Sequence, residues 1–183
     1  TAITGPADIA VKHVLDSLLL LKFAPFPGRT LDAGSGAGYP GIPLAVALPE
    51  SRFVLLDATA KKCAFLSHVC QRIGLANVKV VRGRIGKGPA LSIGRFEQIV
   101  TRATLPPREA ARLLVPFLAP AGRLLLMTAP GEGERPVKKR NGGASVLETI
   151  LPPGAEYGRR ERFVLPLGMG SREIREILRD GPE

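Results

Sequence analysis

The sequence predicts an α/β fold with a doubly wound, mostly parallel sheet. Apolar runs of strand length alternate with amphipathic helix patterns along the chain, and a glycine-rich turn follows the first strand pattern. The 183 residues suffice for one domain with a substantial core and are too few for two full domains. We therefore expect a single domain over residues 1–183.

Strand and helix patterns follow one another in a regular order. A helix is expected over residues 8–21, within an N-terminal helical segment at residues 1–28. Strands are expected at residues 30–33, 52–57, 78–81, 96–100, 123–127 and 163–167, and helices at 42–48, 61–73 and 108–118. Residues 171–179 suit a helix by spacing, whereas the fold would prefer a closing strand. Residues 129–144, rich in glycine, proline and charge, are expected to form a mobile basic loop.

The charge balance favours a polyanionic partner. Lysine and arginine number 26 against 16 acidic residues, for a net charge of +10 and a pI near 10.3. A basic surface without such a partner is the alternative.

No apolar stretch reaches the ~20 residues that span a bilayer. Cys63 and Cys70 are expected to be buried thiols in a reducing compartment, with no metal site, so we expect a cytoplasmic protein.

The most informative segment is L-D-A-G-S-G-A-G-Y-P-G, residues 31–41. Glycines at these positions adopt backbone conformations closed to other residues and let a ligand approach the main chain. Such a turn at the end of the first strand is where doubly wound sheets bind nucleotides. Gly36, Gly38 and Gly41 also satisfy the G-x-G-x-x-G spacing of dinucleotide sites.

Asp32 distinguishes between a dinucleotide and S-adenosylmethionine as the cofactor of this loop. Its carboxylate beside the loop would repel a pyrophosphate, whereas S-adenosylmethionine carries an ammonium and a sulfonium. Unit charges ~4 Å apart interact by a few kcal/mol at an effective dielectric near 20, which is enough to select a ligand. Asp57 fits either cofactor, since both present ribose hydroxyls there. The pattern favours S-adenosylmethionine, and the alternative is a structural loop with an incidental aspartate at each strand end.

Longer motifs narrow the interpretation. The loop continues as P-G-I-P-L-A at residues 40–45, and residues 13–18 have the pattern H-x-x-D-S-L. Further motifs are T-A-I at residues 1–3, L-L-D at 55–57 with K-K and F-L after it, G-L-A-N-V at 74–78 and T-R-A at 101–103. Over most of residues 1–128 the chain resembles the RsmG (GidB) family of 16S ribosomal RNA guanine-N7 methyltransferases. The resemblance implies a Rossmann-like class I S-adenosylmethionine-dependent methyltransferase that acts on ribosomal RNA or the small ribosomal subunit.

The loop analysis and the resemblance together imply a set of site residues. Those expected to bind the cofactor are Asp32, Gly34, Ser35, Gly36, Gly38, Tyr39, Asp57, Ile85, Gly86 and Arg102. His13 and Arg102 are expected to position the substrate. No general base is expected, because guanine N7 carries a free lone pair. The alternatives are a helix-surface pair of His13 with Asp16, a surface salt bridge for Arg102, and Tyr39 packed under the loop.

Basic residues from several loops are expected to contact RNA phosphates: Arg82, Arg84, Lys87, Lys138, Lys139 and Arg140. A solvated charged face is the alternative.

Two other functions stay open, a small-molecule methyltransferase with a closed aromatic pocket and a non-catalytic RNA-binding relative. Gly86 favours the non-catalytic relative, because an acidic residue is common at this position in the family. Members of the family also usually carry a helical extension before T-A-I. T-A-P-G at residues 128–131 replaces the family's usual lysine-glycine. We expect a monomer.

Overall fold

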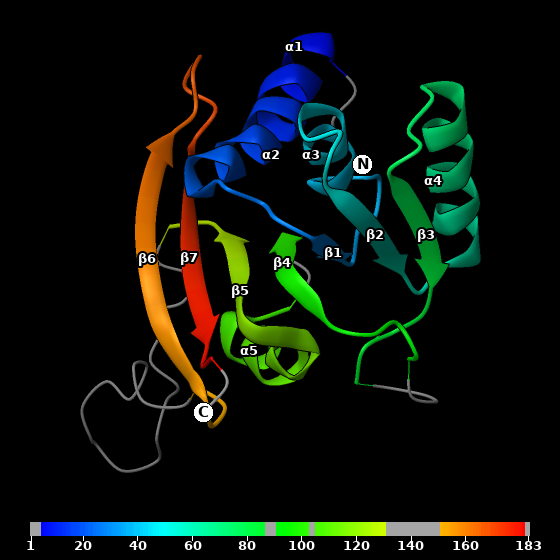
Figure 1. The fold of residues 1–183 in the computed structure, drawn as a ribbon. Coiled ribbons are helices and arrows are strands. Elements are labelled where there is room, and N and C mark those ends of the chain that lie inside the picture. Colours follow the sequence, from blue (N-terminus) through cyan, green and yellow to red (C-terminus); the bar gives the residue numbers. More distant parts are fainter. Residues whose placement is uncertain (1–4, 87–90, 103–104, 131–150, 182–183) are drawn as a thin grey trace, which may run out of the picture.

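The strands form one seven-stranded sheet in the order β3-β2-β1-β4-β5-β7-β6 (Figure 1). The computed structural model describes residues 5–86, 91–102, 105–130 and 151–181. The strand bounds are β1 Arg29–Ala33, β2 Arg52–Asp57, β3 Val78–Arg82, β4 Phe96–Arg102, β5 Leu118–Thr128, β6 Ala155–Val164 and β7 Ser171–Arg179. The first five pair in parallel, and β7 and β6 are antiparallel. The predicted doubly wound, mostly parallel sheet is therefore confirmed.

Helical segments precede the sheet and connect its strands. The N-terminal run is continuous but changes type: α1 Pro6–Ile9, the π-helix η1 Ala10–Leu15, α2 Asp16–Leu18 and the 3₁₀-helix η2 Leu19–Phe23. It occupies the region of the predicted helix at residues 8–21. The connecting helices are α3 Gly41–Ala47, α4 Ala60–Arg72, α5 Pro107–Leu114 and the 3₁₀ turn η3 Val115–Phe117. A π turn is rare and is often found at a functional site, and this one contains His13.

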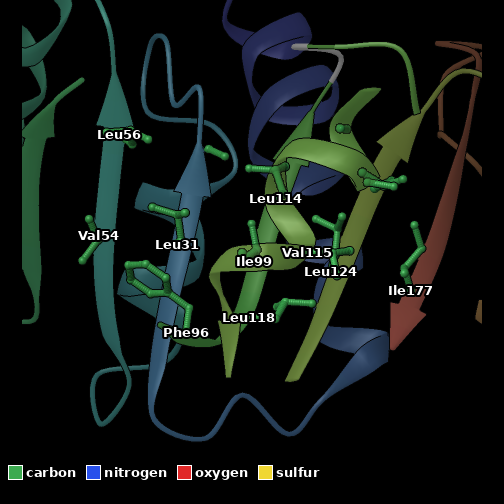
Figure 2. Packing of buried hydrophobic residues seen from close by; sticks show 14 residues of the cluster. Leu31, Val54, Leu56, Phe96, Ile99, Leu114, Val115, Leu118, Leu124 and Ile177 are labelled. Carbon is green, nitrogen blue, oxygen red and sulfur yellow. The ribbon is translucent and has the colours of Figure 1, made fainter. Parts of the chain in front are cut away.

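Both faces of the sheet are covered. On one face, Leu114 and Val115 pack over Leu31, Ile99 and Leu124 from three neighbouring strands (Figure 2). On the other face, a cluster includes residues of η2, α3 and the central strands, and Leu66 and Cys70 of α4 pack on β2 beside it. Alternate residues of the buried strands thus serve opposite clusters, as a sheet between two helical layers requires.

Three predicted elements have wrong boundaries. The strand predicted at residues 123–127 begins earlier, at Leu118, because β5 also pairs with Phe96 of β4 there. The helix predicted to reach residue 118 ends at Leu114, because Pro116 has no N–H to donate and its ring clashes with a helical carbonyl. The strand predicted at residues 163–167 is β6, which starts at Ala155 and ends at Val164. It ends there because the chain turns back: Leu165 N–H donates to the carbonyl of Gly170, at 2.8 Å.

The structure also bears on the predictions for residues 171–179, the two cysteines and the loop at residues 129–144. The ambiguous residues 171–179 form the strand β7. Of the two thiols, both free, Cys70 is buried as predicted, whereas Cys63 is only half-buried. Most of the predicted mobile loop, at 131–144, lies outside the described residues. Within the described ranges, no helix is long and apolar enough to cross a membrane.

Candidate active site

The candidate site lies where the sheet reverses its strand order. The chain runs from β1 outward through β2 to β3, and then returns to the other side of β1 with β4 and β5. In doubly wound sheets, ligands bind at the carboxyl ends of the strands at such a point. Thr101 Oγ1 donates to the carbonyl of Ala33, at 2.8 Å, and joins the ends of β4 and β1 there. The predicted glycine loop leaves β1 at this position.

The loop depends on its glycines for conformation and for space. Gly34, Gly36 and Gly38 have φ of 81°, 57° and 96°, in the left-handed region that glycine favours. A Cβ on Gly38 would lie 2.4 Å from Ile42 Cδ1. A Cβ on Gly41 would lie 2.2 Å from Leu55 Cδ2. A side chain at residue 38 or 41 would therefore force these neighbours to shift.

Asp32 lies beneath this loop and is 1% exposed. Its Oδ2 accepts a hydrogen bond from the backbone N–H of Gly41, at 2.9 Å. Its Oδ1 is buried without a hydrogen-bond partner among the described residues. Burial raises the pKa of Asp32 to about 7. Ser35, also buried, donates from Oγ to the Asp32 carbonyl at 3.0 Å and so braces the loop.

Asp57, the last residue of β2, holds the loop from the other side. Its Oδ2 accepts the Gly36 N–H at 3.1 Å, and its Oδ1 accepts the Thr59 N–H at 2.8 Å. Lys62 Nζ lies 3.7 Å from Oδ2. Burial acts to raise the pKa of Asp57, but these two hydrogen bonds and Lys62 outweigh it and lower that pKa. A charged carboxylate therefore stands at the end of β2 at neutral pH.

His13, Tyr39 and Arg102 meet beside the loop, from three separate parts of the chain. The rings of His13 and Tyr39 stack with centroids 4.7 Å apart, and the Arg102 guanidinium lies 5.5 Å from the Tyr39 centroid. Arg102 is the last residue of β4, one of the strands at the reversal point. Burial and the nearby Arg102 lower the pKa of His13, so its imidazole is neutral at pH 7.

The partner of Arg102 is not evident from the sequence. Asp16, fully buried, accepts from Arg102 Nη1 at 3.2 Å and from Arg172 Nε and Nη2 at 2.7 and 2.9 Å. The spacing in H-x-x-D-S-L indicates His13 as a partner of Asp16. Arg172 lies 156 residues from Asp16, and no local pattern in the sequence indicates that contact.

The remaining predicted residues are dispersed. Ile85 is partly buried and packs against the cluster under α5. Gly86 has a φ of 78°, so an acidic residue there would be strained. Arg82, the last residue of β3, and Arg84, two residues further on, are exposed, whereas Lys87, Lys138, Lys139 and Arg140 lie outside the described residues. No group of three potential metal-ligating side chains occurs in the described part of the chain.

Residues 1–141 match the GidB family, described as "rRNA small subunit methyltransferase G". A relative from Solibacter usitatus, named "Ribosomal RNA small subunit methyltransferase G", is 36% identical over 177 residues, which cover 97% of this chain and 80% of that protein. A relative of the same name from Geobacter sulfurreducens is 33% identical and is covered to 78%.

A solved structure shares the fold. The "SAM dependent methyltransferase from Aquifex aeolicus" superposes with a TM-score of 0.65 at 17% identity, covering 95% of this chain and 94% of that one. At this identity the likeness concerns architecture alone. The family match and the identity to curated relatives over almost the whole chain carry the assignment: the chain belongs to the GidB family of small-subunit rRNA methyltransferases.

Proposed function

We propose that the chain transfers a methyl group from S-adenosylmethionine to N7 of a guanine in small-subunit ribosomal RNA. Membership of the GidB family supports the reaction and the substrate. The observation that carries the cofactor assignment is the buried carboxylate of Asp32 beneath the glycine loop at the reversal point of the sheet. We propose the whole chain to be one methyltransferase domain that works as a cytoplasmic monomer.

The residues of the loop fit a cationic ligand. Asp32 Oδ1 is buried and has no hydrogen-bond partner in the part of the chain that the structure describes. The pKa of Asp32, about 7, means that a nearby positive charge would favour its ionised form. Among the described residues, a Cβ on Gly36 would meet only the Gly34 carbonyl oxygen, in ordinary van der Waals contact at 3.9 Å, so the loop is not crowded there. Asp57 adds a second carboxylate, with a lowered pKa. Two carboxylates around one loop would oppose a pyrophosphate.

Each predicted residue then has a proposed task. S-adenosylmethionine supplies an electrophilic methyl group on its sulfonium. Gly34, Gly36 and Gly38 shape the loop that would hold it, and Ser35 and Asp32 fix that loop on the sheet. Asp57 would accept hydrogen bonds from the ribose hydroxyls, and the backbone at residues 85–86 would lie along the adenosine.

On the substrate side, the stacked His13 and Tyr39 offer aromatic surface for a planar base. Arg102, over the Tyr39 ring, would position the guanine or an adjacent phosphate. A neutral His13 suits a reaction without a general base, since N7 attacks through its own lone pair. Alignment of the nucleophile, the methyl group and the leaving sulfur would then supply most of the rate enhancement.

We further propose that the basic residues Arg82, Arg84, Lys87, Lys138, Lys139 and Arg140 bind RNA phosphates. Arg82 and Arg84 are exposed at the carboxyl end of β3, on the edge of the sheet that carries the loop. RNA affinity should fall steeply with salt, because each phosphate contact releases counterions. Affinity that does not change with salt would contradict this part of the proposal.

The reaction is tested by offering labelled S-adenosylmethionine with small ribosomal subunits, protein-free ribosomal RNA or a metabolite extract. Label in one or both RNA substrates, and none in metabolites, is the expected result. Label in metabolites alone would identify a small-molecule enzyme. Cofactor uptake measured by calorimetry, with no transfer to any substrate, would instead indicate a non-catalytic relative.

A further inference from the structure

We propose that Arg172 is a positioning residue for Arg102, acting through the buried carboxylate of Asp16. The inference rests on the proposed function, in which Arg102 contacts the RNA substrate. Arg172 lies at the start of the antiparallel strand β7, outside the parallel sheet and outside every motif in the sequence that indicated a site. Its hydrogen bonds to Asp16 join the hairpin of β6 and β7 to α2.

Asp16 accepts two guanidinium groups on one buried carboxylate. Arg172 donates to both oxygens, from Nε to Oδ1 at 2.7 Å and from Nη2 to Oδ2 at 2.9 Å. Arg102 donates from Nη1 to Oδ2, at 3.2 Å. The two arginines therefore share Oδ2, and Arg172 makes the shorter, two-pronged contact. Such a bidentate pair is the stronger and more directional of the two arrangements.

Sharing this oxygen limits how closely Arg102 can pair with Asp16. If Arg172 were absent, the buried carboxylate would lose its main partner, and Arg102 would be its remaining guanidinium partner among the described residues. Because an unpaired buried charge is costly, Arg102 would move to pair with both oxygens. That movement would draw it away from the Tyr39 ring, where it now lies 5.5 Å from the centroid. Arg172 thus keeps Arg102 at the substrate edge.

The arrangement also connects three distant parts of the chain. Asp16 belongs to α2, Arg102 ends β4, and Arg172 begins β7. Arg102 also donates to the Lys12 carbonyl, at 3.2 Å, in the π turn that contains His13. The hairpin strand therefore affects the geometry of the predicted substrate side without contributing a group to it.

The test compares Arg172→Gln and Arg172→Lys with the wild-type chain in methyl transfer to small-subunit ribosomal RNA. Arg172 is the better target than Asp16, because its side chain is 19% exposed and that of Asp16 is 0% exposed. Arg179→Gln is the matched control: it removes one arginine from the same strand at the opposite edge, where Arg179 Nη1 donates to the Leu118 carbonyl. Calorimetry with S-adenosylmethionine accompanies each rate measurement.

We expect Arg172→Gln to lower kcat by ~10-fold, about the weight of one charged hydrogen bond, with little change in KM for RNA. Cofactor affinity and the control variant should stay near wild type. Arg172→Lys should restore part of the rate. In a double variant with Arg102→Gln, the second substitution should cost nothing more, since Arg172 acts only through Arg102.

A kcat for Arg172→Gln equal to that of the Arg179→Gln control would overturn the inference, as would losses that multiply in the double variant. A parallel loss of cofactor binding and rate would also overturn it, because that pattern indicates general damage to the fold. The wild-type rate separates this inference from the proposed function. If the wild type transfers no methyl group, the proposed function fails and the inference with it, whereas an active wild type leaves only the positioning role in question.

Discussion

Replacing Asp32 with asparagine removes a charge from beneath the glycine loop and keeps the shape of the side chain. An amide oxygen can still accept the Gly41 N–H that Oδ2 now accepts at 2.9 Å. The substitution should therefore preserve the start of α3. It should also abolish the ionisation of a group that is 1% exposed.

The size of the effect follows from the pKa of Asp32, which burial raises from 3.8 to about 7. The folded state holds this proton more tightly than the unfolded chain does, so stability falls as the pH rises from 3.8 toward 7 and then levels off. One pKa unit corresponds to about 1.4 kcal/mol. Between pH 5 and pH 8 the wild type should therefore lose about 2 to 3 kcal/mol of unfolding free energy that Asp32→Asn does not lose.

Urea unfolding of both proteins at a series of pH values measures this difference directly, and calorimetry measures cofactor affinity on the same samples. The variant should bind S-adenosylmethionine at least ~10-fold more weakly, because it lacks the carboxylate that attracts the cation. In the wild type, affinity should rise with pH up to 7. Parallel stability curves for the two proteins, together with equal cofactor affinity, would refute the reasoning about a buried, ligand-directed charge.

Three further predictions concern other residues. Gly38→Ala should destabilise the fold by about 1–3 kcal/mol in urea unfolding; Gly74→Ala, at a positive φ of 69° but with open space around it, should cost less, and equal costs would contradict the steric argument. Burial opposes ionisation of Glu173, but hydrogen bonds from three arginines lower its pKa to about 2, so its contribution to stability should disappear as the pH falls from 4.5 to 2. Acid unfolding followed by circular dichroism should show this loss in the wild type and not in Glu173→Gln; identical profiles would count against it. Tyr39→Phe should keep the stack on His13 and the transfer rate, whereas Tyr39→Ala should lose rate, and an active alanine variant would remove the stack from the mechanism.

Much of the architecture was predictable because the relevant signals are local. Five parallel strands and their helices follow from apolar periodicity, and the loop conformation follows from glycines whose φ values other residues rarely adopt. The hairpin at the C-terminal end was harder. In β7 an arginine and a glutamate precede each isoleucine, so Ile174 and Ile177, three residues apart, imitate a helical spacing. In the strand these two isoleucines belong to opposite clusters.

The candidate site was predictable where it depends on one segment and missed where it depends on several. Asp32 and Asp57 flank the loop as the sequence suggested, and the structure adds that each also accepts a backbone N–H of that loop or of α3. The pairing of Asp16 with Arg102 and Arg172 joins residues 86 and 156 positions apart. Such contacts can be predicted only once the strand order is known, because the charge pattern along the chain does not specify which strand ends lie side by side.

Identifying the modified atom in ribosomal RNA, after incubation of the chain with labelled S-adenosylmethionine and small ribosomal subunits or their RNA, tests the proposed chemistry most directly. Digestion to nucleosides and mass spectrometry should recover the label as N7-methylguanosine, and its yield should fall with Asp32→Asn and with Arg102→Gln. Label on an exocyclic amine, a base carbon or a ribose hydroxyl, or the absence of any label from RNA under conditions where the cofactor binds, would contradict the account.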